Sequence, residues 1–188
     1  AVPDRSGPAT AVVVNGTPYL VDFGPGVVRR AKARALERSI PALEPVNLRV
    51  AFVTHLHSDH TVGYPDLIFS PWVLGRRLPI DVYGPTGTKA MTSHILQAYS
   101  VDIETRTNEH GNQHDFPDGH KVNAHDIRAG VVYKDKNVTV TAFPTQHAME
   151  SYGYRFDTAD RSIVISGDTS ATQATIDACN GCDVLIHE

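Results

Sequence analysis

The chain has 188 residues, which is enough for one domain with a hydrophobic core and short for two. Its hydrophobic content of 41% and charged content of 20% are those of an ordinary globular protein. A net charge of −4 does not support a molecule-wide field that attracts nucleic acid, and no apolar run is long enough to span a membrane.

Taken in chain order, the spacing of apolar and turn-forming residues predicts a hairpin and then strands with helices interspersed. Strands are expected over 10–15, 19–23, 48–54, 80–83, 131–133, 138–143, 152–156, 162–166 and 183–187. Helices are expected over 27–38, 61–74, 89–99 and 171–178. This order indicates an α+β fold with two mixed β-sheets and helices outside them.

A polar segment over 102–126, rich in Asn, Asp and His, interrupts this pattern and shows no clear period. Segments of this kind usually form surface loops, and long ones often serve a site. We therefore expect a loop or flap insertion around 102–126.

The sequence suggests truncation at both ends. The chain starts at Ala1 with a loop-like segment, shows no targeting segment, and closes on an apolar strand without a cap. We therefore expect a fold that is truncated at both ends. The compartment stays open between the bacterial cytoplasm and the periplasm.

Cys179 and Cys182 have the C-x-x-C spacing of redox pairs and of half a zinc site. A redox pair usually follows a strand and opens a helix, whereas these residues close a predicted helix. No second pair completes a Cys-rich zinc site. We therefore interpret the two residues as half-buried thiols.

The run His55-Leu56-His57-Ser58-Asp59-His60 places three imidazoles and a carboxylate within six residues, directly after a predicted strand. Zinc accepts both kinds of ligand. A tight loop after a strand can turn all four side chains inward, but four ligands this close in sequence cannot all reach one ion without strain. Two adjacent ions solve this, with the first two histidines on one ion and Asp59 and His60 on the other.

Two further ligands are expected where other strands end. His147 follows the strand over 138–143, and Asp168 follows the strand over 162–166. Gly167, just before Asp168, permits close approach of the backbone. Asp168 could instead cap the next helix, but we favour a carboxylate that bridges the two ions.

These residues resemble the metallo-β-lactamase-fold hydrolase superfamily, and within it the ribonuclease Z and arylsulfatase-like branch. The resemblance covers nearly the whole chain. The histidine motif is specific for the superfamily, whereas Gly84-Pro85, Gly153-Tyr154-Arg155 and the terminal His187-Glu188 point to the branch. The matching runs are Asp22-Phe23-Gly24, 54–60, Tyr83-Gly84-Pro85, Phe143-Pro144 with His147, Gly153-Tyr154-Arg155, 166–169 and 183–188.

The resemblance implies an αββα sandwich, a single metallo-hydrolase domain over 1–188 and a dinuclear zinc site at one edge. By position, the first ion would be held by His55, His57 and His147, the second by Asp59 and His60, with Asp168 bridging. Glu188 matches a glutamate that orients a proton-shuttling histidine in ribonuclease Z. That histidine and the last ligand histidine would lie beyond residue 188, so the second ion is expected to be weakly held or absent.

The implied activity is hydrolysis by a zinc-activated hydroxide, with Asp59 orienting the nucleophile and taking a proton. Ribonuclease Z members usually carry a basic arm and a long insert between the Gly-Tyr-Arg and Ser-Gly-Asp runs. Here a plain hairpin joins Arg155 to Ser166. This favours a small phosphodiester, sulfate ester or lactone substrate, with β-lactamase-type amide hydrolysis and transfer-RNA 3′ processing as the alternatives. Nucleic acid stays an alternative partner that is not favoured, and a homodimer is a further alternative.

Two alternative interpretations assign the chain to other classes of protein. The first is a non-hydrolytic iron-binding redox protein with a similar site, against which His60 argues for zinc. The second is an inactive fragment. The remaining histidines are expected on the surface, with a substrate contact from the 102–126 segment as the weaker alternative. They are His94, His110, His114, His120 and His125.

Overall fold

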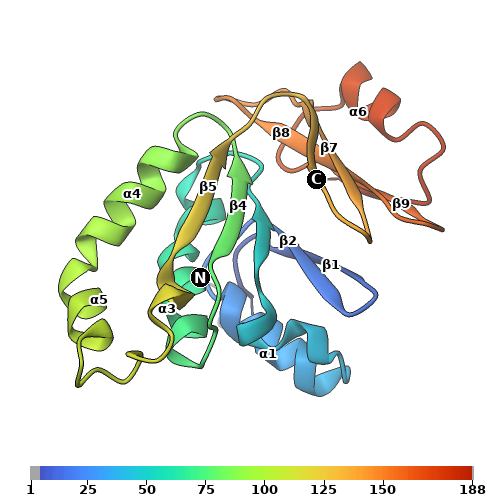
Figure 1. Cartoon of the computed structure of the whole chain (residues 1–188). Coiled ribbons are helices and arrows are strands. Elements are labelled where there is room, and N and C mark those ends of the chain that lie inside the picture. Colours follow the sequence, from blue (N-terminus) through green and yellow to red (C-terminus); the bar gives the residue numbers. More distant parts are fainter. Residues whose placement is uncertain (1–4, 188) are drawn as a thin grey trace.

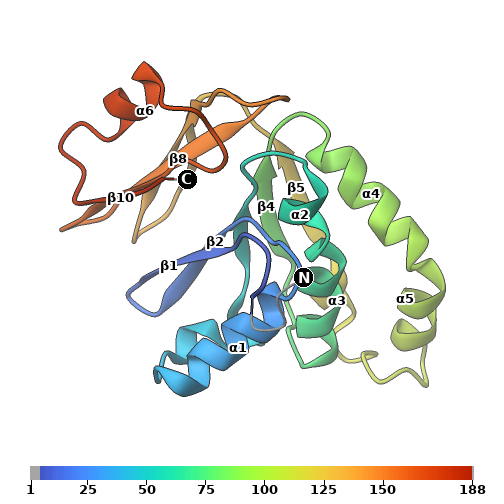
Figure 2. The ribbon, with the colours of Figure 1, turned by 180° about the vertical axis from the view of Figure 1, so that it is seen from behind.

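The structure is a computed structural model that describes residues 5–187. Two five-stranded β-sheets pack face to face, and helices cover the outer face of each sheet (Figure 1, Figure 2). The predicted αββα sandwich of two mixed sheets is therefore confirmed. Within the described range, no helix is both long and apolar enough to cross a bilayer.

The first sheet has the strand order β1-β2-β3-β4-β5. Its strands are β1 (Thr10–Val14), β2 (Thr17–Val21), β3 (Val50–Phe52), β4 (Ile80–Gly84) and β5 (Val122–Asp126). β1 and β2 run antiparallel, and all other neighbours run parallel. The predicted hairpin forms, with Asn15 and Gly16 as its turn at φ values of 50° and 77°. Two positive φ angles suit the tightest hairpin turn, so β2 begins at Thr17, earlier than expected.

The second sheet has the strand order β10-β9-β8-β7-β6. Its strands are β6 (Gly130–Lys134), β7 (Thr139–Pro144), β8 (Tyr152–Asp157), β9 (Ser162–Ile165) and β10 (Val184–Ile186). Only β9 and β10 pair in parallel, and the other neighbours are antiparallel. Both sheets are thus mixed.

The first sheet is covered by α1 (Val27–Glu37), α3 (Tyr64–Val73), α4 (Thr88–Ala98) and α5 (Ser100–Thr107), whereas α6 (Gln173–Ala178) lies outside the second sheet (Figure 1). The short helix α2 (Ser58–Thr61) follows β3. Single 3-10 turns are η1 (Pro41–Leu43), η2 (Pro45–Asn47) and η3 (Pro117–His120).

The core has two layers because side chains alternate along each strand. On β3, Ala51 packs toward the helices, whereas Val50 and Phe52 belong to the layer between the sheets. Phe52 lies at the centre of that layer. Its ring centroid is 5.2–5.9 Å from the rings of Tyr83, Tyr133, Tyr154 and Phe156.

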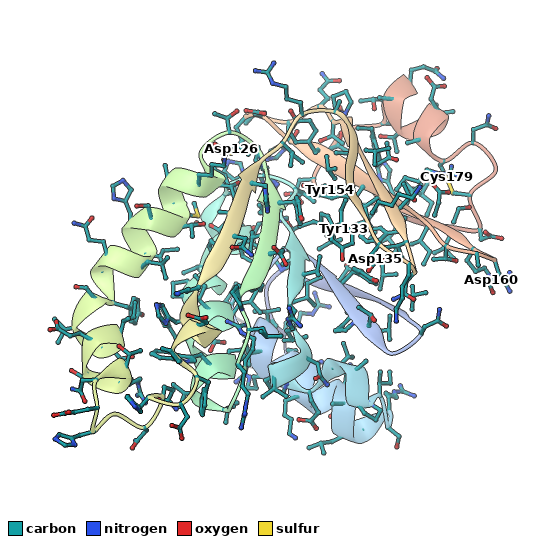
Figure 3. All side chains as sticks on the ribbon, viewed as in Figure 1. Asp126, Tyr133, Asp135, Tyr154, Asp160 and Cys179 are labelled. Atoms are coloured by element: carbon teal, nitrogen blue, oxygen red, sulfur yellow. A yellow bond between two sulfur atoms is a disulfide. The ribbon has the colours of Figure 1, made fainter. Side chains whose placement is uncertain are left out.

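Asp135 joins the two sheets at the turn between β6 and β7 (Figure 3). Its Oδ2 accepts hydrogen bonds from Tyr19 on β2 at 2.6 Å and from Tyr133 on β6 at 3.0 Å. Its Oδ1 accepts from the backbone N–H groups of Asn137 and Val138, which closes the turn. The carboxylate of Asp135 therefore stabilises the β6–β7 hairpin and joins it to β2 of the first sheet.

The loop or flap expected around 102–126 is replaced by α5, η3 and β5, and β5 extends the first sheet beside β4. The strand carries polar residues that still find partners: Asn123 donates to Asp81, and His125 stacks on Tyr83 with centroids 4.4 Å apart. Cross-strand pairs of this kind stabilise the polar positions of a strand in which Val122 packs against the core.

Arg76, whose side chain is buried and only 1% exposed, connects the 102–126 segment to the helical layer. Its guanidinium donates to the carbonyls of Leu67, Ile68, Leu48 and Gly119. Pro71 lies inside α3 and has no N–H to donate to the carbonyl of Leu67, four residues earlier. Arg76 therefore supplies the donor that Pro71 lacks.

Cys179 and Cys182 form a disulfide at the end of α6, and both residues are half-buried (Figure 3). The interpretation as two thiols is corrected in this respect. The backbone brings the residues together because α6 ends at Ala178 and the chain turns at once toward β10. Arg155 on β8 donates to the carbonyls of Ala178 and Asn180, which holds the turn against the second sheet.

Replacing Arg76 by Met keeps most of the side-chain volume but leaves buried carbonyls without donors. We expect the free energy of unfolding, measured in urea, to fall by about 3 kcal/mol or more. The exposed Arg38→Met is the matched control, and we expect it to change the same quantity by about 0.5 kcal/mol or less. Equal stability of the two variants would contradict the role given to Arg76.

The Tyr19–Asp135 contact predicts a loss of stability in alkali. Burial, and then the hydrogen bond to Asp135, raise the pKa of Tyr19 to about 12, above its unfolded value near 10. The folded state favours the neutral phenol, so this stabilisation is complete below about pH 10 and is lost as the pH rises toward 12. Urea unfolding measures this loss. Between about pH 10 and pH 12, the free energy of unfolding should fall less in Tyr19→Phe than in the unaltered chain or in the exposed control Tyr99→Phe. An unchanged pH dependence in Tyr19→Phe would contradict this.

Candidate metal centre

Candidate ligands gather at one edge of the sandwich, where three strands end. His55 and His57 follow β3, and His60 lies in α2 just beyond them. His147 follows β7, and Asp168 follows β9. The two sheets thus bring together side chains that are more than one hundred positions apart in the sequence.

The first ligand group consists of His55, His57 and His147, whose candidate ligand atoms all lie within 4.8 Å of one another. Nε2 of His55 and Nε2 of His147 each lie 3.0 Å from Nδ1 of His57. A proton on Nδ1 of His57 could serve only one of these two neighbours. Three converging imidazole nitrogens fit a cation such as zinc, which accepts them all as ligands.

The second ligand group consists of His55, His60 and Asp168. Nε2 of His60 lies 3.2 Å from Oδ1 of Asp168. Apart from this contact, the buried nitrogen makes no hydrogen bond within the described residues. A buried polar atom without a hydrogen bond is costly, and a bound cation would satisfy it.

Asp59 stands beside the second group without belonging to it. Its carboxylate is 66% exposed and lies 3.8 Å from Nε2 of His60. The side chain is thus close enough to the group to contact a molecule bound there, and its ligand role stays a prediction.

Asp22 lies behind these ligands, buried at the end of β2 with a φ of 64°. Its carboxylate accepts hydrogen bonds from Nδ1 of His60 at 2.9 Å and from the backbone N–H and the hydroxyl of Thr54. Burial raises the pKa of Asp22, whereas these hydrogen bonds act in the opposite direction. A carboxylate that orients a ligand histidine is a common support of zinc sites.

The surroundings shift the pKa values of His55 and His60 in opposite directions. Burial, and then the nearby His60 and His147, lower the pKa of His55 to about 4, so this imidazole stays neutral. Burial also opposes charge on His60, but the hydrogen bond to Asp22 and the neighbouring carboxylates outweigh it and raise the pKa of His60. A neutral imidazole can offer a lone pair to a metal, and a more basic one binds it more strongly.

Gly167 lets its backbone lie close to Thr54, as the sequence suggested. Its φ is 62°, and a Cβ at this position would lie 2.7 Å from Cβ and Cγ2 of Thr54. Only glycine tolerates both constraints. The segment after β9 that carries Asp168 can therefore lie directly against the end of β3.

Five of the six predicted metal ligands thus lie in the two groups, and Asp59 lies next to them. Glu188 is outside the described residues. Sequence reasoning assigned no role to Asp22 or Thr54, although both fall in runs that carried the resemblance. A lone acid between an apolar strand and Gly24-Pro25-Gly26 was the available signal for Asp22.

The remaining histidines belong to neither group. His125 stacks on Tyr83, and His120 packs against Trp72 with ring centroids 4.9 Å apart. His94 and His110 are exposed, as the sequence predicted.

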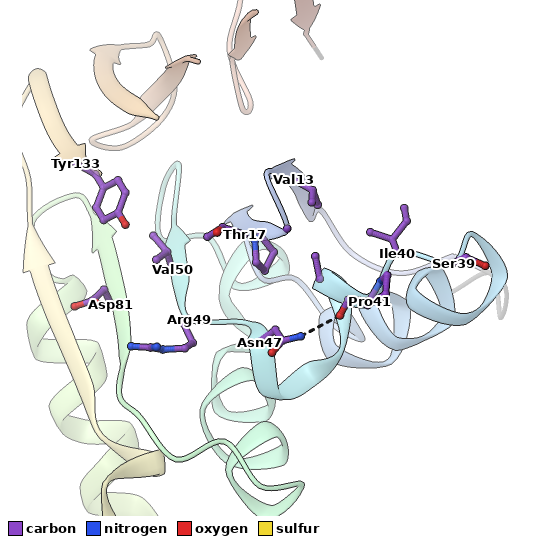
Figure 4. A pocket seen from close by; sticks show the side chains of 13 residues that line it. Val13, Thr17, Ser39, Ile40, Pro41, Asn47, Arg49, Val50, Asp81 and Tyr133 are labelled. Carbon is purple, nitrogen blue, oxygen red and sulfur yellow. Dashed lines mark hydrogen bonds between the residues drawn. The ribbon is translucent and has the colours of Figure 1, made fainter. Parts of the chain in front are cut away.

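The candidate metal centre lies next to a small cavity of about 150 Å³, which is lined in part by His60, Asp168 and His187. A larger cavity of about 710 Å³ lies at the opposite ends of β3 and β4, beside Arg49 and Asp81 (Figure 4). None of its lining residues belongs to a ligand group. Cavity size alone would therefore point away from the ligand cluster.

Comparison with known proteins agrees with this geometry. The protein named Ribonuclease Z from Mycobacterium sp. (strain KMS) is 35% identical over 193 residues, covering 99% of this chain. The Ribonuclease Z of Mycobacterium bovis (strain BCG / Pasteur 1173P2) is 30% identical over 190 residues, covering 98% of this chain. The chain spans 64% of the length of each of these curated relatives.

The crystal structure of human tRNase Z, short form, superposes with a TM-score of 0.72 at 22% identity, covering 98% of this chain and 71% of that chain. A likeness at this level of identity concerns the fold. The profile of the Beta-lactamase superfamily domain matches residues 17–188. The resemblance predicted from the sequence is thus confirmed, and the chain belongs to the beta-lactamase superfamily, with the metallo-β-lactamase fold.

Proposed function

We propose that this chain is the core of a zinc-dependent hydrolase that cleaves phosphodiester bonds. The observation that carries the proposal is the pair of adjacent ligand groups that share His55. Two metal ions side by side are a recurrent arrangement for hydrolysing phosphodiesters.

The donor set supports zinc. Imidazole nitrogens and carboxylate oxygens suit this ion, and His60 in the second group argues against the carboxylate-rich sites that often hold iron. Zinc, when bound, would polarise the scissile bond and lower the pKa of a nearby water toward about 7.

We assign the following roles to the residues of the site. The first ion would be held by His55, His57 and His147, and the second by Asp59 and His60, with Asp168 between them. The exposed carboxylate of Asp59 would accept a proton at Oδ2 as water adds to the substrate. We assign Glu188 a supporting catalytic role on the resemblance alone, and propose that residues 1–188 form a single domain.

RNA is the first candidate substrate. The identity of 35% to a protein named Ribonuclease Z supports it and reverses the preference against nucleic acid drawn from the sequence. The chain spans 64% of that relative, so residues that grip the RNA need not lie within it.

A small phosphodiester is the second candidate. β8 ends at Asp157 and β9 begins at Ser162, so only a tight turn joins them, where Thr158 and Arg161 exchange hydrogen bonds. No long insert is present there to hold a large substrate.

The His57→Ala variant tests the metal site. His57 is the nitrogen donor that lies between His55 and His147, so its loss should reduce the zinc retained after dialysis. Hydrolysis of bis(p-nitrophenyl) phosphate should fall on the order of 100-fold or more. His94→Ala is the control, because this exposed histidine of α4 belongs to neither ligand group.

Three results would count against the proposal. Activity retained in His57→Ala would exclude the first ligand group as the site. Iron with an optical band in the purified protein would favour a redox protein over a zinc hydrolase. A chain that retains no zinc and hydrolyses nothing would be an inactive fragment.

Substrate choice is tested with a panel of substrates. We expect kcat/KM for a transfer-RNA precursor with a 3′ extension to exceed that for small phosphodiesters, sulfate esters, lactones and β-lactams. Asp59→Asn should lower kcat for every substrate that is cleaved, with little change in KM, because the proton acceptor acts in the chemical step. Cleavage of small phosphodiesters without cleavage of RNA would select the second candidate.

A further inference from the structure

Thr54 occupies the point where the two sheets and the ligand groups meet, and it is only 1% exposed. Its backbone N–H donates to Asp22 at the end of β2, and its carbonyl accepts from the N–H of Tyr152 on β8. Its Cβ and Cγ2 pack against Gly167, next to Asp168. Contacts on every side therefore fix the direction of its hydroxyl.

The hydroxyl of Thr54 has two neighbours. It lies 3.1 Å and 3.0 Å from the two carboxylate oxygens of Asp22, and 3.0 Å from Nδ1 of His55. An ionised carboxylate can only accept hydrogen bonds, so the single hydroxyl proton goes to Asp22. Toward His55 the hydroxyl oxygen can then only accept. Nδ1 of His55 must therefore carry the proton, which leaves the lone pair on Nε2.

The same carboxylate acts directly on His60. Asp22 Oδ2 accepts from Nδ1 of His60 at 2.9 Å, which likewise leaves the lone pair of this ring on Nε2. In both rings Nε2 is the atom that faces the ligand groups: toward His57 in one case and toward Asp168 in the other.

We propose that Thr54 is a positioning residue: its hydroxyl connects Asp22 to His55, so that one buried carboxylate sets the tautomers of His55, which belongs to both ligand groups, and of His60. This rests on the proposed metal site. His55 reaches Asp22 only through Thr54, whereas His60 reaches it directly, so removing the hydroxyl releases His55 and leaves His60 held.

The tautomers can be read without any metal or substitution. A long-range ¹H–¹⁵N correlation spectrum of the zinc-free chain, recorded at about pH 8 where an ordinary imidazole is neutral, distinguishes the two forms. We expect His55 to carry its proton on Nδ1. A proton on Nε2 of His55 would overturn the proposal.

Two matched variants then test the hydroxyl itself. Thr54→Val keeps the branched shape but loses the hydroxyl, whereas Thr54→Ser keeps the hydroxyl and loses the methyl group. In Thr54→Val we expect His55 to populate both tautomers and zinc affinity, measured by competition with a chromophoric chelator, to fall about 10–100-fold. His60 should keep its tautomer, and Thr54→Ser should bind zinc much as the unaltered chain does.

The outcomes separate this proposal from the metal site on which it rests. Equal losses of affinity in Thr54→Ser and Thr54→Val would assign the effect to packing against Gly167 and overturn the relay. An unaltered chain that binds no zinc would defeat the proposed function, while the spectrum of the zinc-free chain would still decide the tautomers. If Thr54→Val does not fold, that spectrum alone decides between the two tautomers of His55.

Discussion

The buried carboxylate of Asp22 organises one whole edge of this molecule. It lies at the end of β2, in a backbone conformation with positive φ, and it accepts hydrogen bonds from Thr54 and His60. β2 and β3 pair in parallel, so their carboxyl ends lie side by side and Asp22 falls next to Thr54. A buried charge is tolerated only where such partners are present. The same contacts that make its burial tolerable also orient the imidazoles around it.

The second sheet completes this arrangement from the other side. The N–H of Tyr152 donates to the carbonyl of Thr54, and the hydroxyl of Tyr154 donates to that of Val53. Asp135 makes the corresponding connection through Tyr19, away from the metal centre. With Phe52 packed among aromatic rings between them, the sheets are held at a fixed spacing. Candidate ligands that come from opposite sheets, such as His57 and His147, therefore lie close together.

Much of this could be predicted from the sequence, for identifiable reasons. The candidate ligands over 55–60 lie close together in the sequence, so their density alone indicates them, and Asp168 follows an apolar strand with a glycine between. Asp22 and Thr54 could not be given roles, because their contact depends on a parallel pairing between β2 and β3 that no local pattern encodes. β5 was missed because its alternation is short and its apolar positions are only Val122 and Ala124, while Asn123 on Asp81 and His125 on Tyr83 supply the remaining support. Local periodicity detects apolar faces and is blind to such pairs.

The support that Arg76 gives to α3 has a consequence for how this sequence can change over evolution. Pro71 leaves the carbonyl of Leu67 without its helical donor, and Arg76 fills that position. The two residues are therefore epistatic. A chain that first exchanged Pro71 for a residue with an N–H would relieve Arg76 of one contact, whereas a chain that first lost Arg76 would pass through an intermediate with orphaned carbonyls. Of the two orders, only the first keeps the helical donor to Leu67 throughout, and in either order the loss of Arg76 still removes the donor to the carbonyls of Leu48 and Gly119.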